Sequence, residues 1–132
     1  MIIGLGVDLA EVGPWAEALS RPGAAALLGT FTPGERQTSA AGPAPEGQRL
    51  AARFAAKEAF VKAISSARFG QAPVSAPFDL REIEVIHDAH GRPALRLHGR
   101  AAQVAQALGV RRCWLSLSHE ERMATATVIL EG

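Results

Sequence analysis

The chain contains no tyrosine, only 5% aromatic residues, and a single cysteine, Cys113. One cysteine excludes an intramolecular disulfide and a metal cage built from cysteines. The few aromatic residues leave no stacking platform for single-stranded nucleic acid. The formal net charge is only +1, so no general attraction to nucleic acids or membranes is expected. An anionic ligand would therefore need a local cluster of cations.

Long apolar segments are also missing. No run approaches 18 consecutive apolar residues, so we expect no membrane span. The N-terminal sequence has no basic segment before its apolar stretch, and Asp8 follows early, which argues against a signal peptide. With 132 residues, of which 48% are hydrophobic and 20% charged, the chain is expected to form one globular domain, residues 1–132, in the cytoplasm.

Residues 49–64 lie in the longest run without Gly, Pro, Asn, Asp, Ser or Thr, and they are mostly strong helix formers. Its apolar residues recur at helical spacing, at Leu50, Phe54, Val61 and Ile64. At about 100° per residue, Lys57 falls inside this apolar stripe and Arg53 at its edge. Burying an unpaired charge costs several kcal/mol, so Lys57 indicates more than simple packing. The alternative is that these side chains reach water or form ion pairs along the helix.

Other segments show the periodicity of strands or the signals that begin and end helices. Strands are expected over 2–9, in an antiparallel hairpin within 81–97, and in an antiparallel pair over 113–118 and 123–130. Shorter helices are expected from Gly13-Pro14 to an interruption at Arg21-Pro22-Gly23, over 24–28, from Thr32-Pro33, and over 101–108, with exposed connections at 40–47 and 70–77. This order predicts an α+β fold, with a mostly antiparallel sheet packed against one long helix.

Two local patterns are more specific. Thr32 can cap the helix that begins at Pro33, and Glu35 can complete a capping box. Gly4 and Gly6 lie within the first predicted strand, where glycine usually indicates a bulge or the close approach of another backbone.

Asp8 and Glu58 form the first candidate site. Asp8 ends the apolar run of the first strand, and Glu58 lies on the shoulder of the long helix. If the helix packs across that strand end, the two carboxylates share one site. Such a pair suits Mg²⁺, which takes few protein ligands, or general acid/base catalysis. The alternative is that Asp8 lies in a turn and Glu58 pairs with Lys62 on the surface.

Cations accompany these carboxylates. Three of them lie along the long helix, at Arg53, Lys57 and Lys62, and His119 ends a predicted strand whose hydroxyls include Ser118. A phosphorylated substrate needs carboxylates for a metal and cations for its remaining charge. The sequence has no P-loop, nucleophile elbow or HExxH motif. This favours group transfer without a covalent enzyme intermediate.

Five motifs follow one another along essentially the whole chain: Gly6-Val7-Asp8-Leu9, Phe31-Thr32-Pro33-Gly34-Glu35, residues 50–59 (LAARFAAKEA), Lys62-Ala63, and Ser116-Leu117-Ser118-His119. Together they closely resemble the small phosphopantetheinyl transferases of the holo-acyl-carrier-protein synthase type. The RFAAKEA stretch is the most specific of the five.

The resemblance implies transfer of 4′-phosphopantetheine from coenzyme A to a serine of apo acyl carrier protein, for fatty acid biosynthesis, with release of adenosine 3′,5′-bisphosphate. It implies Mg²⁺ and a homotrimer with active sites at subunit interfaces. It also implies residue roles. Asp8 and Glu58 would hold the metal and, with Lys62, form the catalytic set, while the cofactor-binding residues would be Arg53, Lys57, Lys62, Ser118 and His119.

Two positions depart from the family pattern. Gly13-Pro14 stands where relatives usually carry a basic residue that helps to dock the acidic carrier, which leaves Arg21 or Arg49 as docking candidates. Ser65-Ser66-Ala67 replaces a Gly-rich turn after the signature helix. These departures motivate an alternative, a non-catalytic module that binds coenzyme A or a nucleotide. A third hypothesis is a purely structural oligomerisation domain. Such a domain would not need a cation in the apolar stripe of the long helix, so Lys57 argues against it.

Overall fold

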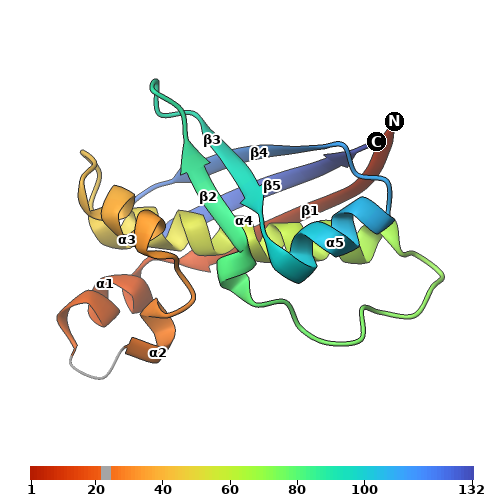
Figure 1. Cartoon of the computed structure of the whole chain (residues 1–132). Helices are drawn as coiled ribbons and strands as arrows, with labels where there is room; N and C mark the ends of the chain where they lie inside the picture. Colours follow the sequence, from red (N-terminus) through yellow and green to blue (C-terminus); the bar gives the residue numbers. More distant parts are fainter. Residues whose placement is uncertain (22–24) are drawn as a thin grey trace.

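The computed structural model describes residues 1–21 and 25–132. One antiparallel sheet has the strand order β1–β5–β4, formed by β1 (Ile2–Glu11), β4 (Arg112–His119) and β5 (Met123–Glu131). A second sheet is the hairpin of β2 (Ile83–His87) and β3 (Pro93–Leu97). The long helix α4 (Glu46–Ala67) crosses one face of the three-stranded sheet (Figure 1). The predicted α+β fold is confirmed, although its strands form two sheets instead of one.

The shorter helices lie where the sequence places them. They are α1 (Gly13–Ser20), α2 (Ala25–Leu28), α3 (Pro33–Ala40) and α5 (Gly99–Ala107), with a 3₁₀ turn at Leu80–Glu82. The capping box at the start of α3 is confirmed, with Thr32 and Glu35 bonding to each other's backbone N–H. Residues 22 and 23 of the predicted interruption, and residue 24 of the next helix, lie outside the described residues. No helix within the described ranges is long and apolar enough to cross a membrane.

The contact between α4 and the sheet is unusually close. Alanines line the buried face of α4, at positions 51, 52, 55, 56, 59 and 63. Opposite them, a Cβ atom added at Gly6 would lie 2.0 Å from the carbonyl oxygen of Ala59. One added at Gly4 would lie 2.3 Å from that of Ala63. The prediction that these glycines mark a close backbone approach is confirmed, and the register of β1 also shifts between Ile2 and Gly4.

Two predicted boundaries are wrong. The strand β1 does not end at Leu9 as predicted, because Ala10 and Glu11 continue to pair with β5. Asp8 therefore lies inside the strand. Helix α4 begins at Glu46, within the segment expected to be an exposed connection. Gly47 is buried there against Ala16 of α1, so packing between the two helices extends α4 beyond its strongest helix formers.

The face of the three-stranded sheet that points away from α4 remains uncovered in one chain. Side chains alternate along each strand, and this outer sheet face carries large apolar residues that are 44–67% exposed: Ile2, Leu5, Val7, Leu9 and Trp114. The chain ends meet at one end of the same sheet (Figure 1). There the Met1 ammonium donates to the carbonyl of Gly132 at 3.0 Å.

Candidate active site

The close packing of α4 on β1 brings Asp8, Glu58 and Lys62 together. Asp8 lies on the face of β1 that points toward the helix, with 14% of its side chain exposed. The Nζ atom of Lys62, which is 56% exposed, donates to Asp8 Oδ1 at 2.9 Å. The carboxylate partner of Lys62 is thus Asp8 on the neighbouring strand, in place of the surface pair with Glu58 considered from the sequence.

The electrostatics of this carboxylate pair are unfavourable without a further cation. Partial burial raises the pKa of Glu58, and the negative charge of Asp8 raises it further, against the opposing effect of Lys62. The hydrogen bond to Asp8 and the charge of Asp8 raise the pKa of Lys62. A divalent cation between the two carboxylates would offset their repulsion. Within residues 1–21 and 25–132, no group of three or more His, Cys, Asp or Glu side chains could hold a metal ion. The possible protein ligands for a metal at this site are therefore the two carboxylates of Asp8 and Glu58.

A cavity of about 620 Å³ opens beside Glu58, between the C-terminal half of α4 and residues 71–80. Its lining is mainly apolar and includes Val61, Ile64, Val74, Phe78 and Leu80. This size and lining are typical of a site for an organic ligand. Glu58 therefore stands at the edge of a space large enough for part of a substrate.

A second group of predicted residues lies around the N-terminal half of α4. Arg53 is 3% exposed. Its Nη2 donates to Thr38 Oγ1, and its Nη1 donates to the carbonyl of Arg49, both at 3.2 Å. His119 Nδ1 and Gln48 Oε1 are 2.9 Å apart. Arg53 and His119 line one pocket of about 470 Å³. Burial and the nearby charge of Arg49 lower the pKa of Arg53 to about 10.

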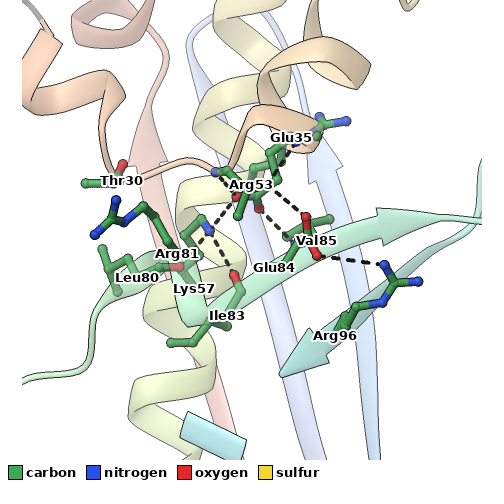
Figure 2. Close-up of polar contacts among 12 residues, drawn as sticks. Thr30, Glu35, Arg53, Lys57, Leu80, Arg81, Ile83, Glu84, Val85 and Arg96 are labelled. Carbon is green, nitrogen blue, oxygen red and sulfur yellow. Dashed lines mark hydrogen bonds and ion pairs between the residues drawn. The ribbon is translucent and has the colours of Figure 1, made fainter. Parts of the chain in front are cut away.

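Lys57 has a different surrounding from the other predicted cations. It is completely buried, and its Nζ donates to Glu35 Oε1 at 2.7 Å and to the carbonyls of Leu80 and Ile83 at 2.8 Å. Figure 2 shows the side chains of Lys57 and Glu35 pointing toward each other beside the backbone of β2. An ammonium has three N–H donors, and all three are used. Lys57 therefore has no donor left for the cofactor that it was predicted to bind, and its contacts are those of a buried structural residue.

Ser118 is also set apart from the pocket of Arg53. Alternation along β4 places Leu117 and His119 in that pocket, whereas Ser118 is exposed on the outer sheet face. Three further residues line the same pocket, Thr38, Arg49 and His87, and none was predicted to belong to it. Arg49 did have a signal, because it precedes Arg53 by four residues on the same predicted helix. Thr38 and His87 had none, because they reach the pocket from α3 and β2 only after folding.

The two groups face different sides of α4. Arg53 and Lys62 are nine positions apart in the sequence, which in an α-helix means about 13.5 Å along the axis and a rotation of about 180°. One chain therefore brings Asp8, Glu58 and Lys62 together, and separately Arg53 and His119, but it does not combine the two groups.

Comparisons with known proteins agree on one family. The sequence model of the 4′-phosphopantetheinyl transferase superfamily matches residues 4–127. The holo-[acyl-carrier-protein] synthase of Mycolicibacterium smegmatis is 42% identical over 130 residues, covering 98% of this chain and 97% of that protein. The ACPS–CoA complex of Chronobacterium ammoniagenes has a TM-score of 0.83 at 40% identity, with 97% and 96% of the two chains covered. The acyl carrier protein synthase of Mycobacterium tuberculosis has a TM-score of 0.75 at 40% identity, covering 99% and 98%.

Proposed function

Since the chain belongs to the 4′-phosphopantetheinyl transferase superfamily, we propose that Asp8, Glu58 and Lys62 form its reaction centre. The chain is an enzyme that transfers 4′-phosphopantetheine from coenzyme A to acyl carrier protein. The observation that carries the proposal is the Lys62–Asp8 ion pair beside Glu58, at the edge of the large cavity. We place the enzyme in the cytoplasm, as a single domain serving fatty acid biosynthesis.

Asp8 and Glu58 are the residues that would hold Mg²⁺. Burial and, after it, the charge of Asp8 raise the pKa of Glu58. Mg²⁺ suits a site with one or two carboxylates because it keeps several non-protein ligands. When bound, Mg²⁺ supplies charge stabilisation at the pyrophosphate of coenzyme A. Lys62 is more than half exposed, so its ammonium can also contact a phosphate oxygen beside Asp8.

The reaction then needs no nucleophile from this chain. The carrier's serine oxygen attacks the β-phosphorus of coenzyme A and forms a new phosphodiester bond. The bond from that phosphorus to the bridging oxygen breaks, and adenosine 3′,5′-bisphosphate leaves with the bridging oxygen. Glu58 is our candidate to accept the serine proton, directly or through a water molecule, because its carboxylate lines the cavity beside the Lys62–Asp8 pair.

Arg53 and His119 are proposed to hold the 3′-phosphate of the nucleotide, in a site completed by a neighbouring subunit of a homotrimer. Two observations support this arrangement. The two groups of site residues lie on opposite sides of α4, and the outer sheet face exposes contiguous apolar side chains. Large exposed apolar patches are typical of interfaces between proteins.

The transfer itself can be measured by intact mass. Apo acyl carrier protein incubated with this protein, coenzyme A and Mg²⁺ should gain the mass of one phosphopantetheine group. EDTA should abolish the gain. Asp8→Asn removes one charge from the metal pair and should slow transfer by about 100-fold or more, the effect expected for losing one electrostatic contact to the reacting phosphate.

Glu17→Gln is the matched control, because Glu17 is an exposed carboxylate in an i,i+4 pair with Arg21 and should leave the rate unchanged. A rate that survives EDTA or Asp8→Asn would exclude the proposed metal pair. Near-normal turnover of Glu58→Gln with Mg²⁺ binding intact would remove Glu58 as the base. Coenzyme A binding without transfer to any carrier would favour the non-catalytic module.

The shared site can be tested by mixing two inactive variants. Asp8→Asn and Arg53→Gln damage different groups, so each variant alone should be slow at coenzyme A concentrations below KM. If each site takes Asp8 from one subunit and Arg53 from its neighbour, coexpressed trimers should recover about one quarter of the wild-type rate, because random assembly pairs two intact groups in one site of four. A mixture no faster than its separate components would place both groups in one subunit's site.

A further inference from the structure

The pocket around Arg53 contains more basic side chains than the two that the sequence indicated. Arg49 and Arg53 come from α4, His87 ends β2, and His119 ends β4. Among the described residues that line this pocket, none is an aspartate or glutamate. Two acidic residues outside the pocket lining affect these side chains: the charge of Glu35 raises the pKa of Arg53, and the charge of Asp88 raises the pKa of His87. The positive charges are therefore not balanced inside the pocket.

Hydrogen bonding in the same pocket is incomplete. The Nε atom of Arg53 and the Nη1 atom of Arg49 are buried without a hydrogen-bond partner in the described part of the chain. The other nitrogens are anchored, since Arg49 Nη2 donates to the carbonyl of Thr38 and Arg53 Nη2 to Thr38 Oγ1. Leaving a charged donor buried and unpaired costs more free energy than leaving a neutral donor unpaired. A phosphate oxygen is a suitable acceptor for such guanidinium groups.

His87 lies half-buried among these charges. Burial lowers its pKa from the ordinary value of 6.5, and the positive charges of Arg53 and Arg49 lower it further, while Asp88 in the adjoining turn opposes them. His87 is therefore mainly neutral at pH 7 when the pocket holds no anion. A phosphate group would reverse the sign of the local field and favour the imidazolium form.

We propose that Arg49 and His87 are further phosphate-binding residues of this pocket, and that His87 takes up a proton when the phosphate binds. This inference rests on the proposed function, in which Arg53 and His119 hold the 3′-phosphate. It adds two binding residues, and it makes recognition of that phosphate dependent on pH. Arg49 thereby becomes a nucleotide-binding residue, which leaves Arg21 as the carrier-docking candidate of the two.

The test compares two ligands that differ by one phosphate. Adenosine 3′,5′-bisphosphate and AMP are titrated calorimetrically into the protein at pH 7, in two buffers of different ionisation enthalpy, so that proton uptake is measured directly. A phosphate with a second pKa near 6 releases protons when it binds to cations, so net uptake must come from the protein. We expect the wild type to take up more protons with the bisphosphate than with AMP.

Three variants assign the effect. His87→Gln should remove the extra proton uptake and weaken bisphosphate binding more at pH 6 than at pH 8. Arg49→Gln should weaken bisphosphate binding by about tenfold or more at both pH values and leave AMP binding unchanged. Arg96→Gln is the charge control, because Arg96 is exposed on β3 and lies 3.9 Å from its nearest carboxylate, Glu84. It should behave like the wild type.

The outcomes separate this inference from the proposed function. If the wild type prefers the bisphosphate but His87→Gln and Arg49→Gln bind and titrate like the wild type, the inference is wrong while Arg53 and His119 keep their proposed roles. The same holds if His119→Gln, and not His87→Gln, removes the proton uptake. If the wild type does not distinguish the two ligands, the 3′-phosphate site itself is wrong. Phosphopantetheine transfer, measured by mass, reports on the enzyme independently.

Discussion

Lys57→Met is expected to destabilise the folded protein by about 3–5 kcal/mol, the usual cost of removing one partner from a buried ion pair. Lys57 and Glu35 both have side chains with no exposed area, and their charged atoms are 2.7 Å apart (Figure 2). Without the ammonium, the carboxylate of Glu35 would stay buried with the backbone N–H groups of Thr32 and Val85 as its remaining donors. The carbonyls of Leu80 and Ile83 would also lose their side-chain donor.

Urea unfolding of single and double variants measures this effect. Glu35→Gln should also be destabilising, because it leaves the ammonium of Lys57 without a counter-charge. The double variant Glu35→Gln/Lys57→Met should lose less stability than the sum of the two single variants, as expected for residues in direct contact. Arg96→Met, at an exposed cation on β3 that lies 3.9 Å from its carboxylate neighbour Glu84, should change stability by no more than about 0.5 kcal/mol. A Lys57→Met variant as stable as Arg96→Met would show that the ion pair does not hold the fold.

Gly6→Ala should be nearly as severe, with a loss of about 3 kcal/mol or more, at the upper end of the range for overpacking a core. The added Cβ atom would lie 2.0 Å from the carbonyl oxygen of Ala59 and 2.6 Å from the backbone nitrogen of Ala63. These are backbone atoms of a helix, so relief requires α4 to move away from β1. Asp8 is two residues further along on the same face of the strand, and its bond to Lys62 spans this contact.

The measurement is again urea unfolding, together with the transfer rate of the fraction that remains folded. Gly13→Ala is the control, because a Cβ atom at Gly13 would have no neighbour within 4 Å. We expect Gly13→Ala to be almost neutral, and Gly6→Ala to lose both stability and activity. A stable and fully active Gly6→Ala protein would mean that the separation of strand and helix does not determine the geometry at Asp8.

The fold was largely predictable because its strongest elements have strong local signals. Alanine-rich helix formers predict α4, and the capping box predicts the start of α3. The glycines of β1 predicted a bulge or the close approach of another backbone, which is that of α4. The extension of β1 past Leu9 depends on pairing with β5, and the start of α4 at Glu46 depends on Gly47 packing against α1. Such distant contacts leave no periodic pattern in the local sequence.

The candidate site was less predictable than the fold. The grouping of Asp8, Glu58 and Lys62 follows from one helix packing on one strand, which was one of the two alternatives that the residue spacing left open. Lys57 was interpreted as a sign of function because its position in the apolar stripe was visible, whereas its partner Glu35 on another helix was not. With that partner known, the charge of Lys57 no longer argues against a structural role. The case against a purely structural domain now rests on the motif resemblance and on the carboxylate pair of Asp8 and Glu58.

The pairing of β1 with β5 has a consequence for how the chain acquires its structure during synthesis. Of the five strands, β1 leaves the ribosome first and β5 last, yet the two are bonded, so Ile2 faces Glu131 in the sheet. Contacts between such distant segments form slowly, because a long loop must close first. The apolar strand that carries Asp8 therefore lacks its sheet partner until β5 has been synthesised. During that interval β1 is open to chaperones and to other nascent chains.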